Sequence, residues 1–564
     1  MRRFDFALIA ILLLAFAVRI WGITFGLPLT VCRPDEGLVV QPALEYFGGD
    51  FDPKFYAYGT LGSYLLHALM RVQLLFELAA GHIVDSREFV QAALLDPGHW
   101  HLVARCSSAI AGVATVWLVY LIGHEVQGRR VALTGAFLLA LCYLHARDSH
   151  FGTLDVLATF FTTAAVYFSL RALNAGSTQA LLFAGACVGF AAATKYGGAM
   201  AACAVLAAGL CQQAAGWRVR TSRLALAGFA SAGAFFLAMP YAAIAPRAVL
   251  AALRRESEHL AQGGGVDLGS GYLRHLTFTL PNGMGLLLFI AAIVGAYWLG
   301  RGHGRRAMTL LAFPVVYLAF AGRGQTVFVR YMLPLTPLLC ALAAVAVMRA
   351  ADLLQARWGT RARFATALLT LVLAAAPAWS LIQFDLLLDR PDSRLLARDW
   401  LLANAPPGAS VAQTGNFART QLPAESQVRE NALRAWAAMS ADRSATARSV
   451  RARFPVLQTI EGAGYPIRRW VESRNEFVSE GGIASGDPDY VILSSSPLLY
   501  FDPPTPEGLA RVLAERYVLV TRIGACDPLK RQEEYDAIDQ FYLPYRSFAG
   551  VERPGPNLAI YARR

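Results

Sequence analysis

Long apolar runs separated by short polar stretches occupy most of the chain before residue 388. A helix needs about 20 apolar residues to cross the hydrocarbon core of a bilayer. The pattern therefore predicts eleven membrane spans, at 6–27, 102–125, 131–146, 153–172, 178–194, 198–215, 224–245, 277–299, 307–321, 331–349 and 364–385.

Two longer segments lie between these runs, and we expect both to be external loops, at 28–101 and 246–276. Within the first, residues 61–84 are fairly apolar, but Ser63, His67 and Arg71 give them a polar side at helical spacing. We therefore expect an amphipathic helix on the outer membrane surface. The second loop contains Gly263-Gly264-Gly265 and is expected to be mobile.

Arginines predict the orientation of the spans, because short cytoplasmic loops are enriched in Lys and Arg. With the N-terminus in the cytoplasm, every inside segment is basic. These segments hold Arg2/Arg3, Arg129/Arg130, Arg171, Arg218/Arg220/Arg223, Arg301/Arg305/Arg306 and Arg349/Arg357/Arg361/Arg363. An odd number of spans then places the C-terminal region outside, so we expect a multi-pass protein of the cell (inner) membrane.

After residue 388 the chain becomes rich in charge, Pro and Gly. Residues 393–404 and 506–515 are predicted helices. Short strands are predicted at 411–413, 490–494, 517–522 and 558–562. The fold class is thus an α-helical polytopic membrane protein, with a membrane domain at 1–388 and a small extracytoplasmic α/β domain at 389–564.

Composition agrees with this picture and excludes other classes. Hydrophobic residues make up 56% and charged residues 16% of the 564 residues, whereas soluble domains carry about 25% charged residues. A soluble enzyme and a disordered chain are both disfavoured. The net charge of +12 could suggest nucleic acid, but membrane topology explains the arginines better, and no nucleic-acid partner is expected. No cysteine or histidine cluster has zinc spacing.

The first candidate site is Arg33-Pro34-Asp35-Glu36-Gly37, just after the first predicted span. An aspartate at the membrane surface can act as general base for a hydroxyl group. Adjacent carboxylates point in different directions, so the sequence leaves open whether Asp35 or Glu36 faces a site. The alternative is a solvated turn, for which this composition is typical.

The second candidate runs from His145 through Arg147, Asp148 and His150 to Asp155, where one predicted span ends and the next begins. Ionisable residues at membrane depth are expensive and usually functional. Asp155 could instead serve as a favourable charge near a helix N-terminus, or pair with Arg147. The two histidines leave a divalent metal open, although no third ligand is evident.

Two further candidates are cationic. Lys195-Tyr196 precedes two glycines, and Lys195 is one of only three lysines among 51 basic residues. A compact ammonium suits a phosphate oxygen; the alternative is a lysine that snorkels to the interface. Arg330 opens an apolar run from the outer side, where it could bind a phosphate bidentately or act as an interfacial anchor.

Carboxylates, arginines and one lysine thus fall at one membrane face, as transfer of a group from a lipid phosphate requires. The order of the motifs resembles the family 39 glycosyltransferases of the GT-C class, which include protein O-mannosyltransferases and aminoarabinose transferases. The motifs are Asp35-Glu36, residues 147–155, Thr194-Lys195-Tyr196 and Arg330-Tyr331-Met332-Leu333-Pro334. Residues 392–408 and 553–557 also resemble bacterial members.

The resemblance implies a polyprenyl-phosphate sugar donor, an external active site and an inverting displacement. It gives Asp35 the base role, has Glu36 and Asp155 order the site or the acceptor, and assigns phosphate binding to Lys195 and Arg330. The acceptor is left open among glycan, lipid and protein; the short 246–276 loop lacks the β-trefoil insertion of eukaryotic mannosyltransferases. Two alternatives remain, a polytopic transporter and a non-catalytic envelope scaffold.

Overall fold

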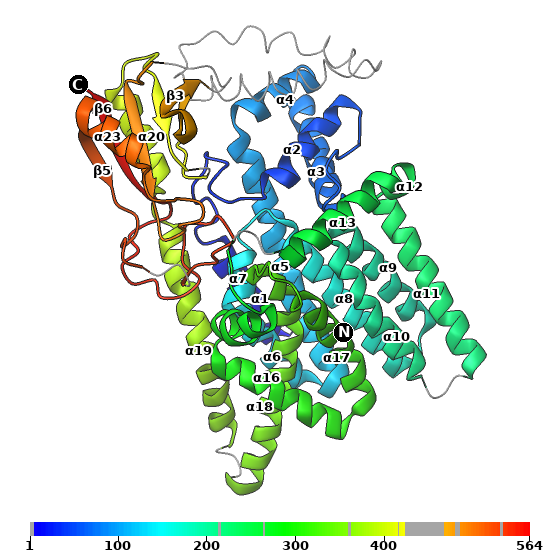
Figure 1. Cartoon of the computed structure of the whole chain (residues 1–564). Coiled ribbons are helices and arrows are strands. Elements are labelled where there is room, and N and C mark those ends of the chain that lie inside the picture. Colours follow the sequence, from blue (N-terminus) through cyan, green and yellow to red (C-terminus); the bar gives the residue numbers. More distant parts are fainter. Residues whose placement is uncertain are drawn as a thin grey trace. The chain divides into compact units, whose positions relative to one another are not determined.

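The computed structural model describes residues 5–212, 216–262, 266–358, 362–415, 417–422, 467–479, 486–530 and 534–564 (Figure 1). The chain divides into two compact units. Unit 1 comprises Met1–Ile23, Asp52–Leu66 and Val103–Asp385, and unit 2 comprises Thr24–Phe51, His67–Leu102 and Leu386–Arg564. The triglycine 263–265 and Arg2, Arg3 and Arg361 lie outside the described residues.

The regular elements in the described part of unit 1 are all helices. Its main helices are α1 (Phe6–Ile20), the later part of α5 (Pro97–Gln127), α6 (Arg129–Ala140), α7 (Tyr143–Asp148), α8 (Leu154–Ala175), α9 (Thr178–Thr194), α10 (Ala202–Leu210), α11 (Trp217–Ala238), α13 (Pro246–Gln262), α16 (Leu286–Gly302), α17 (Gly304–Ala321), α18 (Thr336–Trp358) and α19 (Ala362–Leu388). Shorter elements connect them: η2 (Tyr196–Ala201), α12 (Tyr241–Ile244), α14 (Gly271–Arg274), η3 (His275–Thr279), α15 (Leu280–Met284) and η4 (Val329–Leu335).

Small residues allow the helices of unit 1 to pack closely. Helix α9 lies against α8 and α11, and α18 lies against α16 and α6. A side chain at Gly185 or Gly189 of α9 would collide with the α11 backbone at Ala227 and Ser231. This four-residue spacing of glycines is a common way for membrane helices to approach each other.

Several predicted spans coincide with helices that are long and apolar enough to cross a membrane. Among the described residues there are five such helices, or six if the bent pair Gly271–Met284 and Leu286–Gly302 is one span. They overlap the spans predicted at 102–125, 153–172, 224–245, 277–299, 331–349 and 364–385. The spans expected at 6–27, 178–194 and 198–215 fall on shorter apolar helices. The total of eleven stays a prediction.

Two predicted boundaries differ from the structure. The span expected at 131–146 is split into α6 and α7, because Cys142 adopts an extended conformation between them. Most of the loop expected at 246–276 is the regular helix α13, which starts with Pro246 at the first helical position and contains no breaker before the glycines. Its end is held by Gln325, whose backbone N–H donates to Leu260 O at 2.9 Å.

Unit 2 contains α2 (Gly37–Glu45), η1 (Tyr46–Gly48), most of α3 (Leu61–Ala79), α4 (Ser86–Leu95) and an α/β region with helices α20 (Ser393–Asn404) and α23 (Glu507–Arg516). Helix α3 covers most of the predicted amphipathic segment. The sheet has the order β3-β2-β1-β4-β6-β5. Its strands are β1 (Val411–Gln413), β2 (Ile467–Val471), β3 (Glu476–Ser479), β4 (Tyr490–Ser495), β5 (Tyr517–Ile523) and β6 (Asn557–Arg563).

The sheet is mixed, and helices α20 and α23 pack on its two faces. Strand β1 runs parallel to β2 and β4, whereas β6 pairs antiparallel with β4 and β5. Side chains alternate along each strand, so Val411 and Ile492 pack with α20 while Ala412 and Val491 pack with α23. All four predicted strands and both predicted helices of this region are confirmed; β2 and β3 were not predicted.

Candidate active site

The predicted base lies in the turn that leads into α2. Asp35 is half-buried and has a φ of 71°, in the left-handed region that few non-glycine residues adopt. Such conformations cost free energy and are concentrated at functional sites. The neighbouring Glu36 is fully buried, with 0% of its surface exposed. The structure thus separates the two carboxylates that the sequence could not rank, since Asp35 alone reaches solvent.

A buried ion pair holds this turn in unit 2. Arg33 donates from Nη1 to Asp539 Oδ1 at 2.7 Å, and its guanidinium lies 5.4 Å from the centre of the Phe541 ring. Both side chains of the pair are nearly inaccessible to solvent. Sequence analysis missed Asp539, because nothing in the local pattern links positions 506 residues apart.

Helix α2 is held at its other end by a histidine of α3. His67 Nδ1 lies 2.7 Å from Ala43 O, and Arg71 donates from Nε to His67 Nε2 at 3.1 Å. Because a guanidinium can only donate, Nε2 is the acceptor and Nδ1 carries the proton. The ring packs among Tyr46, Phe47 and Phe51. Burial lowers the pKa of His67 below its ordinary value.

The two motifs of unit 2 that resemble bacterial members lie together. Asp392 caps α20 by accepting from Arg394 N at 2.9 Å, and also accepts from the Arg394 guanidinium at 2.7 and 2.8 Å. Ser393 donates from Oγ to Pro556 O at 2.6 Å and from N to Pro554 O at 2.9 Å. These contacts give both motifs a structural role in fixing the start of the α/β region.

In unit 1, the predicted phosphate ligand Lys195 forms an ion pair. Its Nζ lies 2.6 Å from Asp155 Oδ1, and 20% of the Lys195 side chain is exposed against 5% for Asp155. Lys195 is the C-cap of α9 and Asp155 lies in the first turn of α8, so each charge occupies the helix end that the dipole favours. An ammonium has three N–H donors, and Asp155 can therefore orient Lys195 while another donor faces a ligand.

A segment of the first long loop, residues 56–60, lies beside Lys195. Gly59 N donates to Thr194 O at 3.2 Å, and Tyr196 donates from its hydroxyl to Tyr56 O at 2.8 Å. The Tyr58 ring centre lies 5.1 Å from Lys195 Nζ, a cation–π distance. Sequence analysis missed this segment, although Tyr56 followed by the Tyr58-Gly59 step in an external loop was a usable signal.

Arg330 lies in the 3₁₀ element η4, which packs against α8, the helix that carries Asp155. Only 5% of the residue is exposed, and its guanidinium stacks 4.5 Å from the centre of the Phe328 ring. Stacking and burial fix the guanidinium, which favours bidentate binding of an anion. Helix α8 also contacts η2, which begins at Tyr196.

Three of the predicted substrate ligands are enclosed within unit 1. Arg147 and Asp148 form an ion pair of 3.0 Å with 1% and 0% of their side chains exposed. His150 is also buried; its Nδ1 lies 2.9 Å from Ala146 O and its Nε2 lies 3.0 Å from Trp21 O. Their described bonds are to protein groups, which suits residues that position a loop.

Two charged residues inside predicted spans join this enclosed region and were missed. Arg19 of α1 donates to Ala140 O at 3.1 Å and to His145 Nδ1 at 3.0 Å. Asp385 of α19 lies 3.4 Å from His150 Nε2, with both side chains at most 1% exposed. The available signal was simple, because a charged residue within an apolar span is rare and usually functional.

The structure therefore brings together Asp155, Lys195 and Tyr196, and separately Arg147, Asp148 and His150. Asp35 and Glu36 belong to unit 2. Among the described residues, no group of three His, Cys, Asp or Glu side chains could hold a metal ion.

The chain has the fold of GT-C class membrane glycosyltransferases. It matches the structure of ArnT from Cupriavidus metallidurans bound to undecaprenyl phosphate at 13% identity, over 99% of this chain and 97% of that one, with a TM-score of 0.52. The apo form of ArnT matches at 15% identity, over 98% of this chain and 97% of that one, with a TM-score of 0.51. The apo oligosaccharyltransferase of Archaeoglobus fulgidus matches at 14% identity, over 99% of this chain and 88% of that one, with a TM-score of 0.51.

The family comparison points to the same class. Residues 92–244 match the model of the dolichyl-phosphate-mannose-protein mannosyltransferase family. The chain thus has the helical GT-C fold with a C-terminal α/β region, and residues 92–244 resemble this family of glycosyltransferases. No curated protein sequence matches the chain. In two other structures of the Archaeoglobus oligosaccharyltransferase, the chain covers only 62% and 58% of that protein's length.

Proposed function

We propose that this glycosyltransferase moves a sugar from a polyprenyl-phosphate donor to a cell-envelope acceptor on the outer face of the inner membrane. The N-terminus is cytoplasmic and the C-terminal region extracytoplasmic in this proposal. The observation that carries it is the Lys195–Asp155 pair, in which a lysine held by a carboxylate still exposes 20% of its side chain. The ArnT structure of the same fold was solved with undecaprenyl phosphate.

The reaction follows from the chemistry of the groups. The acceptor hydroxyl oxygen attacks the anomeric carbon of the sugar while the bond from that carbon to the phosphate oxygen breaks. The phosphate leaves with the bonding electrons, and Asp35 accepts the hydroxyl proton. A single displacement of this kind inverts the anomeric centre. The leaving phosphate carries negative charge, so preorganised cations lower the barrier, and we assign this role to Lys195 and Arg330.

The remaining residues have supporting roles in this proposal. Asp155 orients the Lys195 ammonium, and Tyr196 anchors residues 56–60 beside it through its bond to Tyr56 O. Glu36, being fully buried, orders the turn that carries Asp35. Arg147, Asp148 and His150, which were predicted to bind substrate, position the segment before α8. The acceptor can be a glycan, a lipid or a protein; no metal is assigned a role.

Binding of undecaprenyl phosphate by the purified full-length protein tests the phosphate assignment. We expect Lys195→Met to weaken binding roughly tenfold to a hundredfold, because a charge-assisted hydrogen bond contributes about 1.5–3 kcal/mol. Arg330→Met should act similarly. Lys530→Met is the matched control, since Lys530 also pairs with a carboxylate, Glu534, at 3.3 Å but lies in unit 2.

The outcomes are distinct. If Lys195→Met and Arg330→Met both bind like the parent protein, the phosphate site is assigned wrongly. Mass spectrometry of envelope glycans with and without the protein tests transfer itself. Unchanged glycans in a deletion strain would favour a scaffold or transporter instead.

A further inference from the structure

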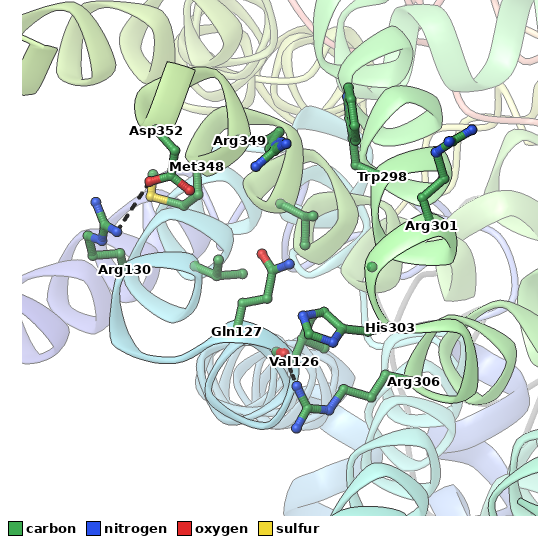
Figure 2. A pocket seen from close by; sticks show the side chains of 13 residues that line it. Val126, Gln127, Arg130, Trp298, Arg301, His303, Arg306, Met348, Arg349 and Asp352 are labelled. Atoms are coloured by element: carbon green, nitrogen blue, oxygen red, sulfur yellow. Dashed lines mark hydrogen bonds and ion pairs between the residues drawn. The ribbon is translucent and has the colours of Figure 1, made fainter. Parts of the chain in front are cut away.

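A cavity of about 540 Å³ opens where four helix ends of unit 1 meet beside α18 (Figure 2). It is lined by the C-terminal ends of α5 and α16, the first turns of α6 and α17, and the second half of α18. None of these residues has a role in the proposed transfer. The lining includes arginines from the segments that the sequence assigned to the inner side of the membrane.

The charge of this cavity is strongly positive. Four arginines line it, together with one carboxylate, Asp352; the arginines are Arg130, Arg301, Arg306 and Arg349. Asp352 lies 3.4 Å from Arg130, and Arg306 donates to Val126 O at 2.8 Å, as the dashed lines in Figure 2 show. One carboxylate cannot compensate four guanidinium groups, so the cavity suits an anion.

Helix dipoles do not account for this arrangement. Cations are favourable at helix C-termini and unfavourable at N-termini. Arg301 lies in the last turn of α16, where the dipole favours it. Arg130 and Arg306, however, lie in the first turns of α6 and α17. A helix N-terminus by itself attracts anions, and two arginines beside two such ends add to that attraction.

Aromatic rings hold two of the guanidinium groups in place. The Arg349 guanidinium lies 4.9 Å from the Trp298 ring, and that of Arg301 lies 5.7 Å from the Tyr297 ring. Arg301 also donates to the Tyr297 hydroxyl at 3.2 Å. A stacked guanidinium keeps its edge available for the bidentate contact that phosphate prefers.

Part of the cavity lining is apolar. Val126, Val131, Val345 and Met348 line it, and each is at most 7% exposed. A cationic lining that also contains apolar side chains fits an anion whose phosphate meets the arginines. Basic pockets between membrane helices on the cytoplasmic side bind anionic lipid headgroups in other proteins.

We propose that this cavity binds a phosphate-bearing anion, with Arg301 and Arg349 as its principal ligands. Two sources share this chemistry: the headgroup of an anionic phospholipid and a soluble phosphate compound. The site is separate from the sugar-transfer groups and does not depend on the proposed function.

The test uses the full-length protein in detergent at constant ionic strength. Three probes are titrated: dioctanoyl phosphatidylglycerol, dioctanoyl phosphatidylcholine and inorganic phosphate, with bound ligand measured by native mass spectrometry and calorimetry. The variant is Arg301→Gln with Arg349→Gln. Arg305→Gln is the matched control, because Arg305 is an exposed arginine in the first turn of α17, adjacent to the lining residue Arg306, and does not line the cavity.

We expect the double variant to bind phosphatidylglycerol about tenfold or more weakly, and the control to stay within about twofold of the parent. This result, with weak phosphatidylcholine binding, supports a lipid headgroup. Saturable inorganic phosphate binding lost in the same variant, without a phosphatidylglycerol difference, supports a soluble source. Parental affinity for both anions in the double variant, or equal loss in the Arg305 variant, overturns the site.

Arg301 and Arg349 are exposed, and thermal midpoints check that the variants fold. If the double variant unfolds, the two single variants carry the test.

Discussion

Two ion pairs of unit 1 look equivalent in sequence but differ in the structure. Lys195 and Asp155 lie 2.6 Å apart, and 20% of the lysine side chain reaches solvent. Arg147 and Asp148 lie 3.0 Å apart, with no more than 1% of either side chain exposed. The first pair presents a cation that a ligand can reach, whereas the second is enclosed by protein. Charge at membrane depth thus has two separable uses, binding and positioning.

The same distinction holds in unit 2, where Asp35 is half-buried and the adjoining Arg33–Asp539 pair is enclosed. Replacing a reachable group should change activity and leave stability nearly intact. Replacing an enclosed group should do the reverse, because the partner would remain buried without its counter-charge. The predictions below test this division.

The largest effect is expected for Asp35→Asn. A positioned base contributes about a hundredfold to ten-thousandfold in rate, so turnover should fall by about that factor while undecaprenyl phosphate binding and the thermal midpoint stay near parental values. Asparagine also tolerates the left-handed backbone of this position, so the turn should survive. Initial rates with a polyprenyl-phosphate sugar measure the loss.

Glu36→Gln is the comparison for that experiment. Since Glu36 is fully buried, its replacement should lower stability more than turnover. Near-parental turnover in Asp35→Asn together with an inactive Glu36→Gln would move the base to Glu36. Activity in both variants would remove this turn from catalysis.

Asp148→Asn should be the next largest change and should act on stability. Removing one partner of a buried ion pair costs about 3–5 kcal/mol. The matched control is Asp399→Asn, because Arg398 and Asp399 form an adjacent pair of the same order at 3.1 Å, with 61% of the aspartate exposed. Exposed pairs contribute only about 0–1 kcal/mol. Unfolding in mixed micelles, followed by circular dichroism, compares the two; equal losses would refute the distinction between enclosed and exposed pairs.

Local pattern was sufficient for much of the fold. The strands β1, β4, β5 and β6 each contain a short apolar run, and helix α20 has a capping aspartate, so each could be predicted from a few adjacent residues. Lys195 could be singled out because lysine is rare in this chain. These signals depend only on neighbouring positions, and the sequence carries them directly.

Pairing across long separations could not be predicted in the same way. Arg33 meets Asp539, which is 506 positions away, and Arg19 of the first helix meets His145. Neither residue has a local pattern that names its partner, since only the packed fold brings them together. The burial of a side chain also depends on the packed fold. Asp35 and Glu36 are adjacent carboxylates in the sequence, whereas in the turn before α2 Asp35 is half-buried and Glu36 is fully buried.

The smallest expected effect concerns His67 of unit 2, an enclosed group that can be switched by pH. The described hydrogen bonds of His67 require a neutral imidazole, because Nε2 accepts from Arg71 while Nδ1 donates to Ala43 O. Protonation would remove the acceptor and place a second positive charge beside Arg71. Burial lowers the pKa of His67 below its ordinary value of 6.5, so the unfolded chain binds the proton at a higher pH than the folded protein does.

The sign of the effect follows from this difference. Stability from neutral His67 is fully present above about pH 6.5 and is lost as pH falls toward the folded pKa, with a slope of at most about 1.4 kcal/mol per pH unit.

We expect His67→Phe to be less stable at pH 7.5 but to show a shallower decline in stability down to pH 5. His82→Gln is the control, since the His82 side chain is 70% exposed and pairs with Glu77 at the end of α3. Thermal midpoints across this range measure the slopes. Because α2 begins two residues after Asp35, the same acidification should loosen the turn that carries the proposed base, so turnover should fall with stability in the parent protein. A His67→Phe variant with the parental slope would show that another group sets the pH response.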